Sequence, residues 1–528
     1  MDFSKIILLC NTIIYLKPVQ VYYRLFYFFK NSFRSTQKYI KAPSVISSIN
    51  WKNIYNYSNS YSYLNKTFTF LNISYSFSEK INWNFDQFGK LWVYNLNYFD
   101  FLNQKEMSSE TGIHLINDFI KNDKILKDAK EPYTISLRGV NWIKFLAQNK
   151  IQNSVINNLL YNHYVILIKN LEYHLLGNHL LENAFSLLFG AYYFQDEHFY
   201  VKSKKLLISE LDEQVLKDGA HFELSPMYHQ IILSRLLDSI HLIKLNNSWK
   251  KDDLLSFLKT KASLMISWLH NITYKNGNIP MVNDSTFDIA PNSEKLFLYA
   301  KGLEISNQEI PLSDSGYRKI TSYNYELLLD IGNIGPDYQP GHGHSDTFNF
   351  ELLKNGIPIF VDTGISTYEK NNLRQRERST SSHNTVQIEN LEQTQVWDGF
   401  RVAKRAKVNI LKEKYNSIKA SHDGYQNKGY CHTRTYMWEE KFIIIKDEIN
   451  KSTNNKSKAF FHLHSSLNKP LIKENKVILE QFDSYITFIN AASIEIDQYQ
   501  LSQGFNKTEF AFKITVTFDK SLETKILI

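Results

Sequence analysis

The sequence has very few cysteines and no long run of apolar or basic residues. Cys10 and Cys431 are its two cysteines in 528 residues, and neither lies in a Cys-x-x-Cys pattern. A disulfide framework is therefore excluded, so packing and hydrogen bonds must hold the fold. Lysine and arginine residues are scattered, without a run long enough to form a nucleic-acid-binding arm.

The N-terminal residues are apolar, but their runs are too short to span a bilayer. Residues 6–10 and 13–16 are separated by Asn11 and Thr12, and no small-x-small cleavage site follows them. We therefore expect no clean signal peptide and a cytoplasmic or membrane-associated protein, with a periplasmic location as the alternative. The pattern of residues 1–35 predicts an amphipathic helical segment. It either packs on the protein, as we favour, or contacts a membrane surface.

Length and charge bound the class of protein. A chain of 528 residues is too long for one ordinary core, so two or three domains are expected. Hydrophobic content of 43% and charged content of 22% are typical of a folded globular protein. The formal net charge of +8 favours an acidic partner. Because the basic residues are scattered, an acidic polysaccharide or oligosaccharide is at least as good a candidate as nucleic acid, and the charge alone does not choose between them. We expect the polysaccharide and no nucleic acid.

The residue pattern predicts an α+β multidomain protein in three parts. An N-terminal amphipathic helix and an extended lead-in occupy residues 1–90. Residues 91–310 show repeated helical periodicity with short connections, which predicts antiparallel helical hairpins arranged as a bundle or as an α/α toroid, an incomplete helical barrel. After Gly316, alternating apolar and polar residues predict an antiparallel β-sandwich over residues 320–528.

A predicted hairpin in the β half gathers histidine and aspartate residues. The pair Asn355-Gly356 separates two apolar strands and predicts a two-residue turn. Asp362 then emerges at the same end of the hairpin as the loop that carries His342 and His344. Together with His383, these side chains form a His/Asp set suited to one divalent metal ion, and we expect zinc. The alternative is that the two neighbouring histidines merely lie at a strand edge.

Two stretches of the helical half place polar groups at helix starts. Asn178 and His179 open a predicted helix, although a role for Asn178 as N-cap alone is the alternative. Ser225 and Pro226 predict an N-cap and a first helical residue, which puts Tyr228 in a first turn with its ring facing inward. Such a phenol either packs as a buried structural tyrosine or exchanges protons. In the second case the positive helix end and the nearby histidines are expected to favour its ionised form.

Three arginines at alternate positions precede His383 in the sequence. Arg374, Arg376 and Arg378 would lie on one side of an extended segment, from which they would contact an acidic chain. The alternative is that they belong to a solvated loop.

These motifs resemble the heparinase II/III family of polysaccharide lyases, with its alginate-lyase relatives. The resemblance rests on five motifs: Asn178-His179, Ser225-Pro226-Met227-Tyr228-His229, Gly341-His342-Gly343-His344-Ser345-Asp346, Phe360-Val361-Asp362-Thr363-Gly364 and Ser381-Ser382-His383-Asn384-Thr385. It extends from Leu91 through the β half and is weak in the first 85 residues. The resemblance implies an α/α toroid followed by an antiparallel β-sandwich, with the active cleft between them, and β-elimination next to a uronic acid.

The resemblance also implies roles for individual residues. Asn178 with His179 would hold the uronate carboxylate, which must be neutralised so that the C5 proton becomes acidic. Tyr228 would be the base, the acid or both, and His342 would be the second proton-transfer group.

Further residues are expected to hold the metal and the substrate. The implied ligands of a structural zinc ion are His344, Asp362 and His383. The residues expected to contact substrate in addition are Glu182, His229, Arg374 and Arg378.

Three functions remain open from the sequence. The leading one is a lyase that cleaves a uronic-acid-containing polysaccharide and is linked to surface polysaccharide metabolism. A glycoside hydrolase on the same fold would need two apposed carboxylates, for which Glu182 and Glu223 are the nominees. The third is a polysaccharide-binding or assembly protein without catalytic activity.

Overall fold

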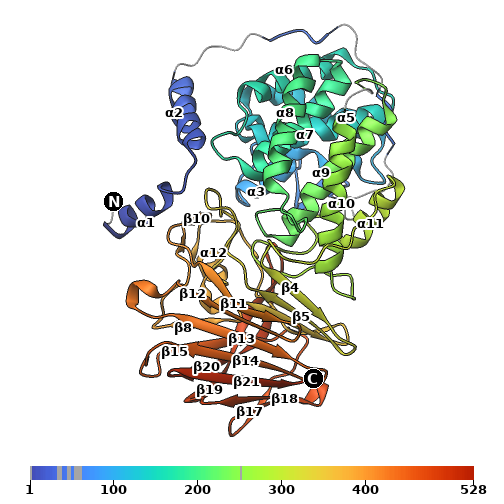
Figure 1. Cartoon of the computed structure of the whole chain (residues 1–528). Helices are drawn as coiled ribbons and strands as arrows, with labels where there is room; N and C mark the ends of the chain where they lie inside the picture. The colour runs from blue at the N-terminus through green and yellow to red at the C-terminus, as the bar shows by residue number, and fades with distance from the viewer. Residues whose placement is uncertain (1–2, 33–38, 44–48, 53–61, 250–252) are drawn as a thin grey trace.

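The chain forms a helical half and a β-rich half that stack on each other (Figure 1). The computed structural model describes residues 3–32, 39–43, 49–52, 62–249 and 253–528. Helices precede the large sheets along the chain, and all the paired strands of those sheets are antiparallel. The predicted fold class, a helical half followed by an antiparallel sandwich, is therefore confirmed.

Two N-terminal helices lie to one side of the junction between the halves (Figure 1). α1 (Phe3–Ile13) and α2 (Pro18–Ser32) are bent by 116° relative to each other. In the described part of the chain no single helix is long and apolar enough to cross a membrane, although α1 and α2 taken together meet that test by length and composition. The predicted helical segment is thus two helices up to Ser32, and residues 33–35 lie outside the described residues.

Consecutive helices build the helical half around one hydrophobic core. Its helices are α3 (Lys90–Tyr98), α4 (Ser109–Asn122), α5 (Pro132–Gln148), α6 (Ser154–Lys169), α7 (Gly177–Phe194), α8 (Glu197–Gln214), α9 (Pro226–Leu245), α10 (Leu254–Ile272) and α11 (Ser293–Gly302). A small sheet of β1 (Tyr63–Leu64), β2 (Thr67–Phe70) and β3 (Ile73–Ser76) precedes them. The predicted apolar stripe of α10 is buried, as its periodicity requires.

Polar side chains fix where several of these helices begin. Ser108, Asn153, Asp196, Ser225 and Asn292 each accept a hydrogen bond from a backbone N–H of the first turn. Such caps satisfy donors that no intrahelical carbonyl reaches. The cap at the start of α9 matters most for the site, because it sets the turn that carries a predicted catalytic residue.

The β half consists of two layers of antiparallel strands. One layer is the sheet β11-β12-β13-β14-β21-β18-β17-β16, and the other joins β19-β20-β15-β8 to β4-β5-β6-β7. The strands of the second layer are β4 (Tyr317–Thr321), β5 (Tyr325–Asp330), β6 (Phe350–Lys354), β7 (Ile357–Phe360), β8 (Val386–Ile388), β15 (Ser457–His462), β19 (Ser493–Gly504) and β20 (Lys507–Phe518).

The strands of the first layer, a small hairpin and a short helix complete the β half. The strands of the first layer are β11 (Val408–Lys414), β12 (Ser417–His422), β13 (His432–Trp438), β14 (Phe442–Ile449), β16 (Leu471–Lys473), β17 (Lys476–Leu479), β18 (Ser484–Ile489) and β21 (Ser521–Leu527). A two-stranded hairpin of β9 (Val396–Trp397) and β10 (Arg401–Val402) and the short helix α12 (Asn372–Glu377) lie on the side that faces the helices (Figure 1).

Strand β5 is buried on both faces and ties the two halves together. Leu327 and Leu329 belong to the sandwich core, whereas Leu328 between them belongs to the helical core. This division follows from the alternation of side chains along a strand. The loop from β5 to β6, which carries the predicted histidines, is therefore anchored in a sheet that is packed on both sides.

The predicted hairpin between β6 and β7 is also present. Asn355 and Gly356 have φ values of 50° and 77°, which is the left-handed conformation that a two-residue type I′ turn requires at both positions. As predicted, Asp362 leaves the hairpin at the end where the histidines gather, and its Oδ2 lies 2.8 Å from Nδ1 of His383.

Candidate active site

A cavity of about 1130 Å³ lies between the helical half, the β half and the two N-terminal helices. Residues of α1, α2, α3, α5, α7 and α9 line it, together with loops of the β half. The four residues predicted to act in catalysis, Asn178, His179, Tyr228 and His342, are all part of its lining. The structure thus brings together side chains from three separate segments of the chain.

The lining of this cavity is rich in cationic side chains. Its cations are Arg24, Lys90, Arg235, Lys370, Arg401 and Arg405. Among the described residues, its carboxylates are Asp100 and Glu369. A cleft of one predominant sign concentrates counter-charged ligands, so this cavity favours a polyanion.

The predicted start of α9 is confirmed and positions Tyr228. Ser225 accepts a hydrogen bond from the backbone N–H of Tyr228 at 3.2 Å, and Pro226 occupies the first helical position. The Tyr228 ring stacks on the His342 imidazole with ring centres 3.9 Å apart. The hydroxyl of Tyr368 donates to that of Tyr228 at 3.2 Å, which leaves the Tyr228 proton free to be donated.

The expectation that its surroundings favour the ionised form of Tyr228 is wrong for the free protein. Burial raises the pKa of Tyr228, and the nearby carboxylates of Asp284 and Glu223 raise it further. The hydrogen bond from Tyr368 and the charge of Arg374 lower it, but not enough to compensate. Tyr228 is therefore a neutral phenol here, suited to give a proton rather than to take one.

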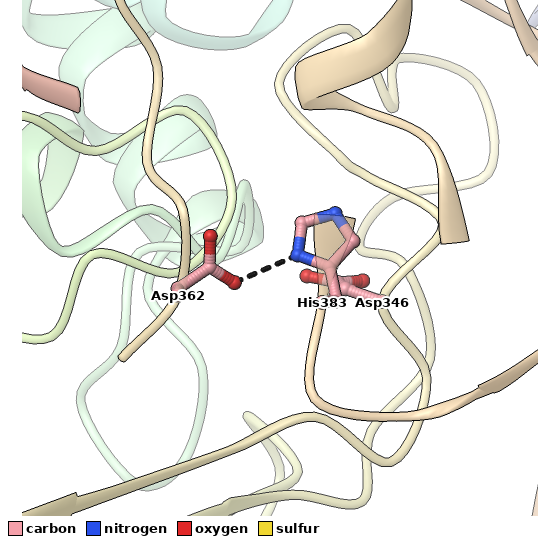
Figure 2. A group of neighbouring side chains, drawn as sticks. All are labelled: Asp346, Asp362 and His383. Carbon is pink, nitrogen blue, oxygen red and sulfur yellow. Dashed lines mark hydrogen bonds and ion pairs between the residues drawn. The ribbon is translucent and has the colours of Figure 1, made fainter. Parts of the chain in front are cut away.

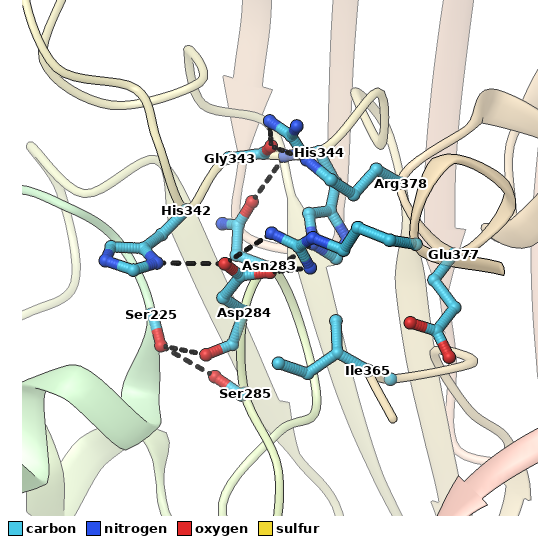
Figure 3. A network of polar contacts seen from close by, with 12 residues as sticks. Ser225, Asn283, Asp284, Ser285, His342, Gly343, His344, Ile365, Glu377 and Arg378 are labelled. Carbon is cyan, nitrogen blue, oxygen red and sulfur yellow. Dashed lines mark hydrogen bonds and ion pairs between the residues drawn. The ribbon is translucent and has the colours of Figure 1, made fainter. Parts of the chain in front are cut away.

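His342 is oriented by Asp284, which the sequence reasoning missed (Figure 3). Nδ1 of His342 lies 2.9 Å from Oδ2 of Asp284. Because a carboxylate only accepts, Nδ1 carries the proton, and Nε2 of the neutral ring is the free base. Nε2 lies 3.4 Å from Nδ2 of Asn178 and 3.5 Å from Oε2 of Glu223. Asp284 lies in a loop without periodicity, so no sequence pattern signals its role.

Asp284 is also the centre of a wider buried network. Its two oxygens accept from Arg374 at 2.5 and 2.7 Å, and Oδ1 lies 2.9 Å from Nε2 of His344. Although burial opposes its charge, Arg374 and the two histidines hold the pKa of Asp284 well below its ordinary value. The carboxylate is therefore charged and fully paired.

Asn178 is held by Glu223 and is not an N-cap. α7 begins one residue earlier, at Gly177, and no side chain caps it. Instead, Glu223 accepts from the backbone N–H of Asn178 at 3.0 Å and from its Nδ2 at 2.8 Å. A carboxylate at a helix start is favoured by the exposed N–H groups and the helix dipole. It fixes the amide of Asn178 beside His342.

His179 lies next to Asn178 and is about one third exposed, with a side-chain accessibility of 32%. Burial lowers its pKa, but Glu172, whose Oε1 is 3.0 Å from Nδ1, more than offsets this, and Glu223 and Glu182 act in the same direction. The pKa of His179 is therefore raised. Its cationic form is available to bind an anionic group in the cavity.

The four residues predicted to contact substrate in addition lie outside the cavity lining. Glu182 is 1% exposed and pairs with Arg235 at 3.3 Å, so the cation that reaches the cavity is Arg235. His229 is fully buried between the backbone N–H of His221 and the carbonyl of Met265. Neither side chain lines the cavity, and both instead hold neighbouring parts of the chain in position.

The arginine segment is helical and not extended. α12 covers Asn372–Glu377, so alternate arginines do not share one side. Arg374 is fully buried against Asp284, and Arg378 is fully buried with its guanidinium donating to the carbonyls of Gly343 and Gly399. Both arginines organise the loops around the site and have no exposed surface for a substrate.

Asp346, Asp362 and His383 form a buried group that could hold a metal ion (Figure 2). One ligand atom from each lies within 4.8 Å of the others. Within the part of the chain that the structure describes, Oδ2 of Asp346 and Nε2 of His383 have no hydrogen-bond partner. Buried polar atoms are normally paired, so these orphans fit a metal at this position.

This group contains two of the three predicted ligands, Asp362 and His383, and differs from the prediction at the third residue. His344 points its Nε2 at Asp284, and Asp346 takes its place in the group. The Nδ1 of His344 is also buried without a partner among the described residues, and its ring centre is 5.3 Å from that of His383.

Comparison with known proteins identifies the family. The heparinase II/III N-terminus model matches residues 134–300, and the heparinase II/III-like, C-terminal model matches residues 306–528. The chain therefore belongs to the heparinase II/III family, as its motifs indicated.

Curated relatives are similar over part of their length. A heparin-sulfate lyase of Bacteroides thetaiotaomicron is 24% identical over 289 residues, which are 46% of this chain and 39% of that protein. The heparin-sulfate lyase of Pedobacter heparinus is 24% identical over 310 residues, which are 53% of this chain and 45% of that protein. The match thus spans less than half the length of each.

Solved structures share the fold. A crystal structure of heparinase III has a TM-score of 0.64 at 15% identity and covers 93% of this chain and 87% of that one. A heparan sulfate lyase from Pedobacter heparinus has a TM-score of 0.54 at 17% identity, with 86% and 79% covered.

The network around Asp284 predicts the effect of removing its charge. Asp284→Asn leaves the Arg374 guanidinium buried without a compensating carboxylate, so the free energy of unfolding should fall by about 3 to 5 kcal/mol. The control is Glu448→Gln, which breaks an exposed pair with Lys419 and should cost no more than about 1 kcal/mol. Denaturant unfolding measures both, and equal losses in the two variants would contradict the argument.

Proposed function

We propose that this protein is a polysaccharide lyase that cleaves a uronic-acid-containing acidic polysaccharide by β-elimination. The observation that carries the proposal is the stacked pair of Tyr228 and His342, which lies beside Asn178 and His179 in a cationic cavity. Its relatives named heparin-sulfate lyases support the same reaction class.

The geometry supports one direction for the two proton transfers. Nε2 of His342 takes the proton from C5 of the uronate, and the electrons of that C–H bond form the double bond between C4 and C5. The bond from C4 to the glycosidic oxygen breaks, and this oxygen takes the proton of the Tyr228 hydroxyl. A neutral phenol and an imidazole oriented by a carboxylate suit the acid and the base respectively.

Neighbouring groups lower the cost of the carbanion-like transition state. Asn178 and protonated His179 neutralise the uronate carboxylate, into which charge from C5 is delocalised. Arg235 adds a second cation to the same wall of the cavity. Because Glu223 and Glu172 already hold Asn178 and His179, little reorganisation is needed when substrate binds.

A glycoside hydrolase is less well supported by the same site. Hydrolysis needs two carboxylates that face each other across the scissile bond. The nominees Glu182 and Glu223 are buried and committed to Arg235 and Asn178. Neither is among the residues that line the cavity.

A panel of uronate polymers tests the proposal, with heparan sulfate first. Wild-type protein should produce the near-ultraviolet absorbance of an unsaturated uronate. Tyr228→Phe keeps the ring and loses the proton, so turnover should fall by at least ~100-fold while folding and binding persist. Tyr415→Phe is the matched control, because Tyr415 is 98% exposed.

The alternatives give different results in that panel. A hydrolase would release reducing ends without the absorbance, and a binding protein would give neither signal while retaining affinity. Near wild-type turnover in a folded Tyr228→Phe variant would remove this residue from the mechanism.

The raised pKa of His179 predicts a pH dependence of binding. The protonated form, which attracts the uronate carboxylate, is present below that pKa and is lost as the pH rises through it. In the Tyr228→Phe background, affinity for a polymer that the wild type cleaves should therefore fall by about tenfold as the pH rises above the ordinary histidine value of about 6.5. The His179→Gln variant should bind the polymer more weakly and show no fall in affinity over this pH range. If the same fall persisted in that variant, another group would be responsible for it.

We further propose that this protein holds a zinc ion, with Asp346, Asp362 and His383 as its protein ligands. Zinc supplies a structural cross-link there between three loops of the β half. The three proposed ligands take no part in proton transfer, which Tyr228 and His342 perform.

Elemental analysis tests the metal directly. Purified protein should contain near-stoichiometric zinc, and Asp362→Asn and His383→Gln should lose it and melt at a lower temperature. His270→Gln, at an exposed position, is the control and should keep the metal. His344→Gln decides between the ligand set expected from the sequence and the one proposed here, because loss of zinc in this variant would restore His344 as a ligand.

The location of the protein in the cell stays a prediction from its sequence: cytoplasmic or membrane-associated, with a periplasmic location as the alternative. The exposed apolar residues of the N-terminal helices, such as Phe3, Ile14 and Phe28, support membrane contact as a proposal.

A further inference from the structure

The N-terminal helices form one wall of the cavity and are held there by specific contacts. On the β side, Trp397 donates to the hydroxyl of Thr12 at 3.1 Å, and the guanidinium of Arg405 stacks on the ring of Tyr15 at 3.5 Å. On the helical side, the hydroxyl of Tyr27 donates to the carbonyl of Leu171 at 2.6 Å. α1 and α2 therefore bridge the two halves on one side of the cavity (Figure 1).

Gln20 is the buried centre of this attachment. Its side chain is buried, with an exposure of 1%. Its amide nitrogen lies 3.1 Å from the carbonyl of Leu175 in the helical half and 3.4 Å from that of Tyr338 in the β half. Tyr338 precedes His342 in the same loop, so α2 is joined to both sides of the catalytic cleft.

One helical turn after Gln20, Arg24 also lines the cavity. In the described part of the chain no carboxylate lies within ion-pairing distance of Arg24. Burial lowers its pKa, and Arg401 from β10, which lines the same cavity, lowers it further. Arg401 pairs with Asp398 at 3.4 Å and also lies over the ring of Trp397, 4.9 Å from its centre.

Two guanidinium groups that line the same cavity repel each other, as the lowering effect of Arg401 on the pKa of Arg24 indicates. That arrangement becomes favourable when an anion lies between them, because each guanidinium donates to carboxylate or sulfate oxygens in a fixed fork. The rigid attachment of α2 through Gln20 reduces the entropy lost when such an anion binds.

We propose that Arg24 and Arg401 form a substrate subsite that binds an anionic group of the polysaccharide, a carboxylate or a sulfate, away from the reacting uronate. This inference rests on the proposed function for its substrate class. It assigns α1 and α2, outside the two matched family regions, a part in the substrate cleft.

This subsite is tested by measuring the binding and turnover of three polymers: heparan sulfate, its chemically desulfated form and alginate. Arg24→Gln and Arg401→Gln should each raise KM about tenfold and change kcat less than about threefold, since the subsite binds a non-reacting part of the chain. Lys5→Gln removes the same charge from α1 outside the cavity and should leave KM unchanged. The double variant should lose less than the product of the single effects, because both arginines hold one anion.

The three polymers separate the two sources of the anion. An effect of Arg24→Gln that vanishes on desulfation identifies a sulfate, and one that persists on alginate identifies a carboxylate. An unchanged KM in a variant that cleaves normally would overturn the subsite while leaving the lyase intact.

Binding measured without turnover separates the subsite from the proposed function. If the wild type cleaves no polymer but binds one, and Arg24→Gln weakens that binding about tenfold, the lyase proposal fails and the subsite stands. If the wild type neither binds nor cleaves any of the three, both proposals fail.

Discussion

The buried carboxylate of Asp284 is the interaction on which the site depends. It comes from the loop between α10 and α11, and it accepts from His342 and His344 of the β5–β6 loop and from Arg374 of α12. A buried charge is tolerated only when its partners satisfy it fully, so all three segments must adopt their positions together. The tautomer of His342 is a consequence of that requirement.

Local features of the sequence predicted a large part of the fold. Apolar periodicity located the helices and strands, Ser225 and Pro226 placed Tyr228 in a first turn, and Asn355-Gly356 fixed the hairpin. Each signal acts over a few residues, through a cap, a turn or the side-chain period, so it can be recognised without the tertiary structure. The same hairpin signal predicted that Asp362 would lie near His383, and the structure places the two side chains 2.8 Å apart.

Contacts between residues far apart in the sequence determine the side-chain roles that the sequence predicted wrongly. Arg374 has the chemistry of a substrate contact, and only the position of Asp284, 90 residues away, turns it into a buried partner. His229 has the same chemistry as His342, yet its place on α9 buries it against Met265. Burial likewise reversed the expected ionisation of Tyr228, because the helix dipole and nearby cations act more weakly than desolvation there.

The strand that divides the two cores explains how such distant residues keep one geometry. β5 packs on the helices through Leu328 and on the sandwich through Leu327, so the halves cannot rotate about it without opening both cores. Gln20 adds a second bridge across the cleft. A cavity held on two sides keeps Tyr228 and His342 stacked before substrate arrives, and a polar site that is organised in advance stabilises developing charge without further rearrangement.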